Sequence, residues 1–358
     1  MKILDGIGLA VVLALSATGI ALTRPARIEA MVPGLRWDLD PDTTALGFGE
    51  PNDAVILDVM RELFGPHMSP KLPEDASPAA LGLDPGQLSK GMGLFVRKCM
   101  HCHGTSGGAD GPTAVWVKPS PRNLRKGVLK FTSTPSGVAP VREDILRILH
   151  NGVAYTAMPN FASDPKEERE ALASFVQFLL LRGKTESSLA FTLDDEGTFE
   201  EDLAPEELRT AVLGYAQDAY QEVEEEFSSA RGQVLNPPIP RPPSDSASIE
   251  RGRTLFLSAR TECSACHGQK GDGYGPNVYD ADQKVFKLED SWGNKAQPAD
   301  LRLGIYRGGN RPIDIYRRIF AGIKGTPMPS FGDSLKPEQI WDLVNFVLNI
   351  PYDPEMND

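Results

Sequence analysis

The sequence is poor in histidine and cysteine, with five histidines and four cysteines among 358 residues. All four cysteines lie in two short motifs, CMHCHG at 99–104 and CSACHG at 263–268. A small secreted domain built on disulfides would have cysteines along its whole length, and a thioredoxin-like dithiol needs no histidine directly after its second cysteine. The cysteine pattern therefore excludes both of these classes.

The Cys-x-x-Cys-His pattern is the attachment signature of c-type haem. Its two thiols add across the two vinyl groups of the porphyrin, and the adjacent histidine is then held under the iron as an axial ligand. The sequence therefore predicts two covalently attached haem c groups. The residues that would attach and ligate them are Cys99, Cys102, His103, Cys263, Cys266 and His267. The alternative is one zinc ion bound by the four cysteine thiolates, which satisfies tetrahedral coordination but gives the two histidines no role.

Haem iron has a second axial position, which methionine usually fills in electron-carrying cytochromes c. Met158 in AMPNF and Met328 in PMPSF each follow one attachment motif. A single methionine would be weak evidence, because most methionines fill gaps in protein cores. Two Met-Pro-x-Phe strings at similar distances from two haem motifs are much stronger. We therefore predict that Met158 and Met328 are the sixth ligands of the two irons.

The similarity between the two halves of the chain extends beyond these ligands. GMGLF at 91–95 and GRTLF at 252–256 precede the attachment motifs, and REDILRILHNG and PIDIYRRIFAG precede the methionines. After each methionine comes a run with apolar residues at three- and four-residue intervals, EREALASFVQFLLLR and KPEQIWDLVNFVLNI. This spacing is typical of an amphipathic helix. The chain thus contains an internal repeat.

The repeated pattern resembles the class I cytochrome c domain, over roughly residues 86–183 and 247–351. The resemblance implies an all-α fold with two tandem domains, which we place at 86–184 and 247–358. In that family the first and last helices cross at a contact between a glycine and an aromatic residue. The counterparts here are Gly91 and Phe95 against Phe175 or Phe178, and Gly252 and Phe256 against Trp341 or Phe346.

Two further expectations come from the same resemblance. Pro121 in SPRNL and Pro298 in QPADL correspond to the family proline whose carbonyl holds the proximal histidine. The last helix of the first domain has no counterpart of Trp341, and its methionine loop HNGVAYTAMPNF lacks the GTPMPSF form of the second. If one haem has the weaker sixth ligand, we therefore expect it to be the first.

The N-terminal region has a different character. Residues 6–23 (GIGLAVVLALSATGIALT) contain no charge and are long enough for a candidate membrane helix. They also fit a signal peptide, with Lys2 before them and a small-residue site ending at Ala21. Both interpretations export the rest of the chain, and we favour a retained anchor at 1–23 on the periplasmic side of the cytoplasmic membrane. Residues 24–85 are predicted to form an extended arm with one short helix at 52–64.

Charge is distributed unevenly along the chain, whose net value is −12 at pH 7. Residues 185–246 contain 15 acids and 3 bases, whereas residues 70–184 contain 10 acids and 15 bases. The acidic segment combines a predicted helix at 204–227 with a stiff Pro-rich spacer at 236–243. We interpret 185–246 as a solvated linker; alternatively, its helix lies against the basic first domain and sets the distance between the haems. The chain has no basic stripe, which argues against a nucleic-acid partner.

Two His/Met haems without a substrate-pocket motif favour an electron carrier over an enzyme. We predict a membrane-attached dihaem cytochrome c that carries electrons in a periplasmic respiratory chain, with redox proteins as partners and no small-molecule substrate. One alternative is a dihaem cytochrome c peroxidase, whose catalytic haem must open a coordination site. The two matching Met-Pro-x-Phe loops argue against it. Another alternative is a cytochrome subunit of a larger dehydrogenase or oxidase complex, with the same chemistry.

Overall fold

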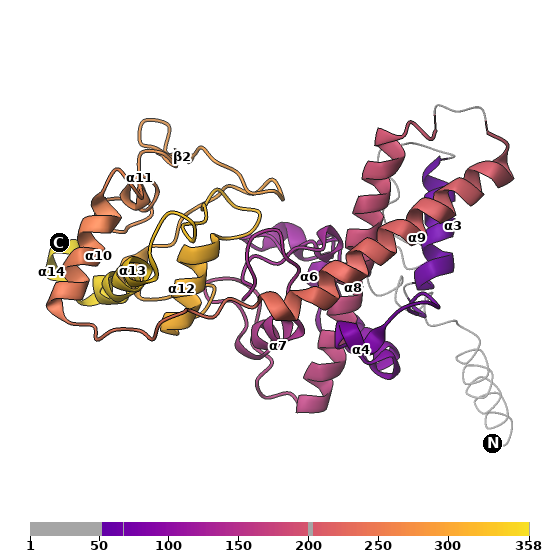
Figure 1. Ribbon diagram of the computed structural model, residues 1–358, viewed down its shortest axis with the longest axis horizontal. Helices are drawn as coiled ribbons and strands as arrows, with labels where there is room; N and C mark the ends of the chain where they lie inside the picture. The colour runs from indigo at the N-terminus through magenta and orange to yellow at the C-terminus, as the bar shows by residue number, and fades with distance from the viewer. Residues whose placement is uncertain (1–51, 67, 200–202, 358) are drawn as a thin grey trace, which may run out of the picture.

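The computed structural model describes residues 52–66, 68–199 and 203–357, and within these ranges its regular secondary structure is almost entirely helical, with long loops between the helices (Figure 1). The predicted all-α fold is confirmed. The apolar segment at 6–23 lies outside the described residues, as does the part of the predicted arm before Asn52. None of the helices in the described ranges has the length and apolar content needed to cross a bilayer.

The two repeats, here called domain 1 and domain 2, have the same order of helices. Domain 1 contains α5 (Leu88–Lys98), α6 (Met100–His103), α7 (Arg142–Asn151) and α8 (Lys166–Asp195), with short 3-10 turns at Pro85–Gln87, Ala114–Trp116 and Leu124–Lys126. Domain 2 contains α10 (Ser246–Leu257), α11 (Cys263–His267), α12 (Pro312–Ala321), α13 (Pro337–Asn349) and α14 (Pro354–Asn357), with 3-10 turns at Leu301–Leu303 and Ile350–Tyr352. Its loop after α11 forms an antiparallel hairpin of β1 (Tyr279–Asp280) and β2 (Val285–Phe286).

The first and last helices of domain 1 cross where the repeat predicted. A Cβ atom on Gly91 would overlap the carbonyl oxygen of Ala171, so α5 and α8 can approach this closely only with glycine at that position. The rings of Phe95 and Phe175 meet edge to face beside the crossing, with centroids 5.3 Å apart. Phe175 is therefore the aromatic partner, rather than Phe178.

Domain 2 has the same crossing between α10 and α13. A Cβ on Gly252 would overlap the backbone of Asp342, and the rings of Phe256 and Phe346 have centroids 5.3 Å apart. Trp341 instead packs on Tyr316, with centroids 4.6 Å apart. Trp341 is therefore not part of the helix crossing, and the crossing in domain 1 does not need a counterpart of it.

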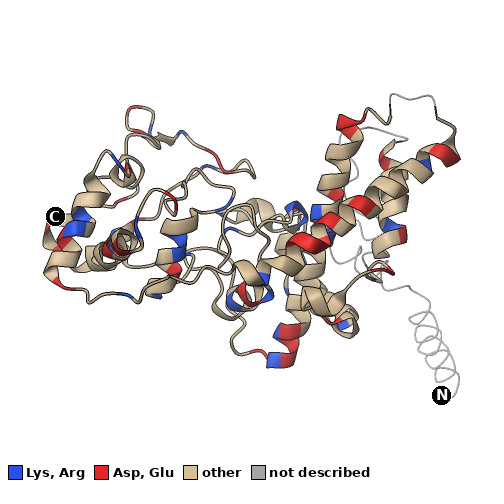
Figure 2. Ribbon diagram, in the orientation of Figure 1, with Lys and Arg blue, Asp and Glu red and all other residues tan. Residues whose placement is uncertain are grey.

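The acidic segment after domain 1 differs from the solvated linker that we expected. Helix α8 continues past residue 184 to Asp195, and α9 (Pro205–Ser229) folds back along it. One stripe of α9 is fully buried: Val212, Ala216, Tyr220, Val223 and Phe227. The acids occupy the other faces (Figure 2). Although acids dominate the composition of α9, its apolar residues recur at helical spacing and form one buried stripe. This stripe packs into the core of domain 1, so α9 belongs to that domain.

The short helix predicted at 52–64 is present as α3 (Asn52–Phe64). It packs against α9 and buries Ile56, Val59, Met60 and Phe64. The ring of Phe64 contacts those of Phe178 and Tyr220, with centroids 6.0 and 5.7 Å apart. The described part of the arm, which also carries α4 (Pro78–Leu81), therefore completes a layer of helices at the end of domain 1 away from domain 2 (Figure 1).

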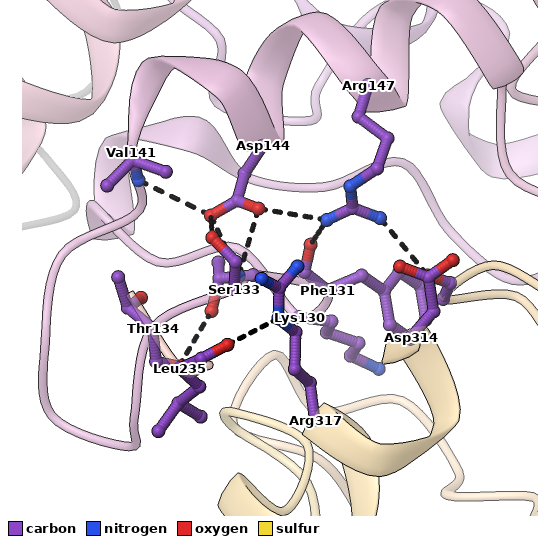
Figure 3. A network of polar contacts seen from close by, with 12 residues as sticks. Lys130, Phe131, Ser133, Thr134, Val141, Asp144, Arg147, Leu235, Asp314 and Arg317 are labelled. Atoms are coloured by element: carbon purple, nitrogen blue, oxygen red, sulfur yellow. Dashed lines mark hydrogen bonds and ion pairs between the residues drawn. The ribbon is translucent and has the colours of Figure 1, made fainter. Parts of the chain in front are cut away.

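Domains 1 and 2 meet through α7, α12 and the loops beside them (Figure 3). Arg147 of α7 donates to the carbonyl oxygens of Phe131 at 2.8 Å and of Gly308, across the boundary, at 3.1 Å. Arg317 of α12 donates to the carbonyl of Leu235 at 3.0 Å, and the Leu235 amide donates to the carbonyl of Ser133 at 2.8 Å. Leu235, the residue just before the Pro-rich spacer, is thus hydrogen-bonded to both domains.

Candidate haem sites

Each attachment motif forms one short helical turn that ends at a glycine. In domain 1 the His103 amide donates to the carbonyl of Cys99 at 2.9 Å, which brings the histidine and both cysteines to one side of the turn. Gly104 then leaves the helix with a φ of 76°, and Gly268 of domain 2 has the same φ of 76°. A Cβ on either glycine would overlap the carboxylate of an aspartate in the following loop. The sequence Cys-x-x-Cys-His-Gly therefore determines this local shape in both domains.

The ring of His103 is held in the orientation that a haem ligand needs. Its Nδ1 lies 2.9 Å from the carbonyl oxygen of Arg122. Because a carbonyl can only accept, Nδ1 carries the proton and Nε2 keeps a free lone pair for a metal. Burial lowers the pKa of His103, which favours the neutral ring that binds iron.

The carbonyl that accepts this bond is not the one that the family resemblance suggested. Pro121 was the expected acceptor, but the bond goes to the next residue, Arg122. The chain is extended just before the 3-10 turn capped by Asn123, and successive residues of an extended chain face opposite sides. In domain 2 the backbone of Ala299, which follows Pro298, faces His267 in the same way, without a hydrogen bond to Nδ1 of good geometry. Burial lowers the pKa of His267 as well.

The loop that presents Met158 is braced by its own hydrogen bonds. The Met158 amide donates to Oγ1 of Thr156 at 3.1 Å, and that hydroxyl donates to the carbonyl of Val153 at 2.8 Å. The Val153 amide in turn donates to the carbonyl of Met158 at 3.2 Å. Gly152 opens the loop with a φ of 65°, and a Cβ there would lie 2.8 Å from the Met158 carbonyl. The loop therefore requires glycine at this position.

The Met328 loop has the same bracing. Its amide donates to Oγ1 of Thr326 at 3.3 Å, Thr326 donates to the carbonyl of Ile323 at 2.7 Å, and the Ile323 amide donates to the carbonyl of Met328 at 3.3 Å. Gly322 opens it with a φ of 70°. The two loops differ in sequence but not in hydrogen bonding, so the structure gives no support to a weaker sixth ligand in domain 1.

All eight predicted residues line one continuous cavity of about 1150 Å³. His103, Met158 and their cysteines contribute from domain 1, and His267, Met328 and their cysteines contribute from domain 2. The other walls are largely apolar, formed by residues such as Phe95, Ile145, Phe256 and Ile315. Such walls, with a few directed polar groups, fit a large flat apolar cofactor. Each predicted histidine and methionine pair therefore faces a space that suits haem.

The positions of the four cysteines contradict the alternative of one zinc ion bound by all of them. All four lie in the described ranges, where no three His, Cys, Asp or Glu side chains gather closely enough to hold a metal ion. Burial also raises the pKa of Cys99 to about 12 and raises the pKa of Cys263 and Cys266. Neutral thiols in an apolar wall suit thioether bonds to a porphyrin better than a cluster of thiolates on zinc.

Comparisons with known proteins agree with this geometry. The family model described as cytochrome c matches residues 249–351, and the model described as cytochrome c oxidase, cbb3-type, subunit III matches residues 86–176. A solved chain from the reducing HAO-like protein complex of Kuenenia stuttgartiensis is similar, with 27% identity and a TM-score of 0.54. The alignment covers 78% of this chain and 99% of that chain. A comparison with curated proteins found no match.

The fold and the two cavity-lining motifs define a helical haem protein. With the two family matches, they show that this chain is a c-type cytochrome with two cytochrome c domains, which binds haem c covalently and acts in electron transfer.

The cavity also contains charged residues that sequence reasoning missed. Arg122 and Lys130 of domain 1 and Arg307 and Arg318 of domain 2 line it between the two sites. The partners of Arg122, Lys130 and Arg318 come from the other domain, so local sequence patterns do not reveal these contacts. One signal was available: Lys130 in GVLK and Arg307 in GIYR occupy the same position of the repeat.

Proposed function

We propose that the chain carries two haem c groups and passes electrons between redox proteins of a respiratory chain. The observation that supports this most directly is the single cavity lined by both sets of predicted ligands. Two haems in one continuous space lie close to each other, and closeness favours electron exchange between them. In this proposal the iron ligands are His103 and Met158 for one haem, and His267 and Met328 for the other.

The protein's part in this function is to hold and shield the haems. When bound, each haem supplies an iron that exchanges one electron between its ferric and ferrous states. The carbonyl of Arg122 keeps the His103 ring oriented, and the hydroxyls of Thr156 and Thr326 hold the methionine loops. The apolar walls exclude water, so little has to reorganise when the charge of an iron changes.

The bracing of the methionine loops supports a carrier rather than a peroxidase. A peroxidase-type haem must release its sixth ligand to admit peroxide. In both loops the methionine amide and carbonyl are hydrogen-bonded within the loop, which begins at a glycine with positive φ. These bonds hold the backbone of each methionine in place, so its side chain starts from a fixed position facing the cavity.

Carbon monoxide binding tests this assignment, because it reports an open sixth position. We expect the reduced protein to bind carbon monoxide poorly and both haems to be low-spin in both oxidation states. Met158→Ala and Met328→Ala should each create one high-spin haem that binds carbon monoxide. Rapid carbon monoxide binding or peroxide turnover by the unmodified protein would favour the peroxidase instead.

A second candidate, a subunit of a larger redox complex, is supported by the structural comparison. The similar solved chain belongs to the reducing HAO-like protein complex, and the alignment covers 99% of that chain. The chemistry of the haems would be unchanged, with electrons passing to or from a partner subunit. Size-exclusion chromatography of the protein extracted from its own cells distinguishes a free carrier from a subunit with stable partners.

We further propose that the protein is anchored at the periplasmic side of the cytoplasmic membrane by residues 1–23. Support comes from the uncharged run at 6–23 and from the export that both interpretations of it imply. The native protein should sediment with membranes and keep its first residues. N-terminal sequencing that begins near Leu22 would show a cleaved signal and a soluble carrier.

A further inference from the structure

Four cations gather where the cavity crosses the boundary between the domains. Arg122 and Lys130 come from domain 1, and Arg307 and Arg318 come from domain 2. We call these four residues the seam cations. Each is half-buried or more in a cavity whose walls are otherwise largely apolar. Nothing in the cytochrome c motifs assigns them a role.

Members of the cluster reach across the boundary in both directions. The Arg122 guanidinium lies 3.6 Å from the ring centroid of Trp292 in domain 2. Lys130 donates to Oδ2 of Asp290 in domain 2 at 2.6 Å. In the opposite direction Arg318 donates to the carbonyl oxygens of Lys130 and Thr132 in domain 1. Three of the four cations therefore contact the other domain, and Arg307 lies near enough to Lys130 of domain 1 to help lower that lysine's pKa.

The cluster has more positive charge than the surrounding carboxylates can balance. Asp290 pairs with Lys130. Asp144 and Asp314 also face Arg318, but they are hydrogen-bonded to Arg147 and Arg311. Cations in a space of low dielectric are costly unless anions or hydrogen bonds compensate them.

Two nitrogen atoms in the cluster are buried donors that the described residues do not satisfy. Nη1 of Arg122 and Nε of Arg318 are both inaccessible to water and have no hydrogen-bond partner in the described protein. Burial lowers the pKa of Arg122 and of Arg318 to about 10, and it lowers the pKa of Lys130 and Arg307 as well. Buried donors of this kind are nearly always satisfied, so an anion that occupies the cavity is expected to meet them.

We propose that the seam cations bind the propionate carboxylates of both haems and thereby couple the two redox potentials. The inference rests on the proposed function, since it requires a haem in each domain. Every haem c carries two propionates, so two haems bring four carboxylates to a cavity that has an excess of cations. Guanidinium groups suit this role because they donate two parallel hydrogen bonds to a carboxylate.

The shared position of the cluster predicts a specific electrochemical effect. A cation near a haem stabilises the reduced iron, which has one positive charge fewer than the oxidised iron, and so raises the potential. A cation that faces both haems acts on both. Removing one seam cation should therefore lower both midpoint potentials, whereas changing an axial ligand acts mainly on its own haem.

The test uses the full-length haem-loaded protein and begins with a count of haems by mass spectrometry. Arg122→Gln and Arg318→Gln are then compared with the unmodified protein by spectroelectrochemical titration. Arg231→Gln is the matched control, because it removes the same charge at an exposed site outside the cavity. Both midpoint potentials should fall in the two cavity variants and stay unchanged in the control. Arg318→Lys, which retains the charge, should keep both midpoint potentials close to those of the unmodified protein.

The haem count tests the proposed function, and the midpoint potentials test the role of the seam cations. Fewer than two covalent haems would overturn the proposed function itself. Two haems with unchanged potentials in both cavity variants would overturn the role of the seam cations, and a shift of one potential alone would overturn the coupling. If Arg318→Gln does not fold because it loses its backbone contacts, Arg122→Gln decides the matter, since the ring of Trp292 still covers the shorter side chain.

Discussion

Lys324 gives a quantitative test of how the two domains are joined. It follows α12 in domain 2 and is 8% exposed. Its ammonium donates to Oγ1 of Thr134 in domain 1 at 2.9 Å and to the carbonyl of Val138. Asp144 and Glu226 attract it, and Arg318 repels it. Burial nevertheless dominates and lowers the pKa of Lys324 from its usual 10.5 to about 8.

This lowered pKa makes the stability of the protein depend on pH. Between pH 8 and 10.5 the unfolded chain binds a proton that the folded chain has released. The free energy of unfolding therefore rises with pH in this window, by about 1.4 kcal/mol per pH unit from this one group. Across the whole window Lys324 contributes roughly 3 kcal/mol. Below pH 8 the ammonium is charged in both states, and its contribution no longer changes.

Lys324→Met should remove this dependence. We expect urea unfolding, followed by circular dichroism at several pH values from about 7 to 10, to give a shallower rise for the variant than for the unmodified protein. Groups that titrate in both proteins cancel in the difference. Lys90→Met, at an exposed position on α5, serves as the control and should leave the slope unchanged. Parallel curves for Lys324→Met and the unmodified protein would refute the reasoning.

Three further predictions concern the haems and the fold. Mass spectrometry of the denatured chain should show two haem additions, and bound zinc without porphyrin absorbance would contradict the cytochrome assignment. Replacing Met328 or Met158 with histidine should lower the potential of one haem and leave the other nearly unchanged; the ligand assignment fails if both redox waves stay in place. Gly252→Ala should lower the free energy of unfolding by about 1–3 kcal/mol because the new methyl overlaps α13. Gly214→Ala on α9, where the methyl meets nothing within 4 Å, should leave the protein as stable or slightly stabilised in the same urea titration.

The parts of the site that could be predicted are those determined by short stretches of chain. Cys-x-x-Cys-His-Gly determines one helical turn and its end, and the Met-Pro strings mark the opposite wall of the cavity. The glycines at the helix crossings were predicted through the family resemblance, and the structure shows why they are needed: a Cβ on Gly91 would overlap the carbonyl oxygen of Ala171 and the Cβ of Phe175. The choice between Phe175 and Phe178 was not, since both are buried apolar residues on one helix and only packing distinguishes them.

The helix α9 shows why charge alone is a poor guide to packing. Acids dominate the composition of its segment, but Val212, Ala216 and Tyr220 recur at spacings that keep them on one face. The periodicity was present in the sequence, and only the direction of that face required the structure. Ion pairs such as the 3.6 Å contact between Lys184 and Glu226 lie at the margin of this packing and contribute little, because they are partly exposed.

The two repeats have the same predicted iron ligands but differ in the seam cations. This difference affects how electrons would move between the haems. Lys130 and Arg307 occupy equivalent positions, so each domain brings one cation from the same loop. Arg122 and Arg318 have no such counterparts: the equivalent residues are Ala299 in domain 2 and Ile148 in domain 1. The two halves of the cavity therefore contribute two cations each, but one cation of each pair comes from a different position around similarly ligated irons. If the seam cations bind the propionates, two sites with the same ligands can have different potentials, which gives an electron a preferred direction across the boundary.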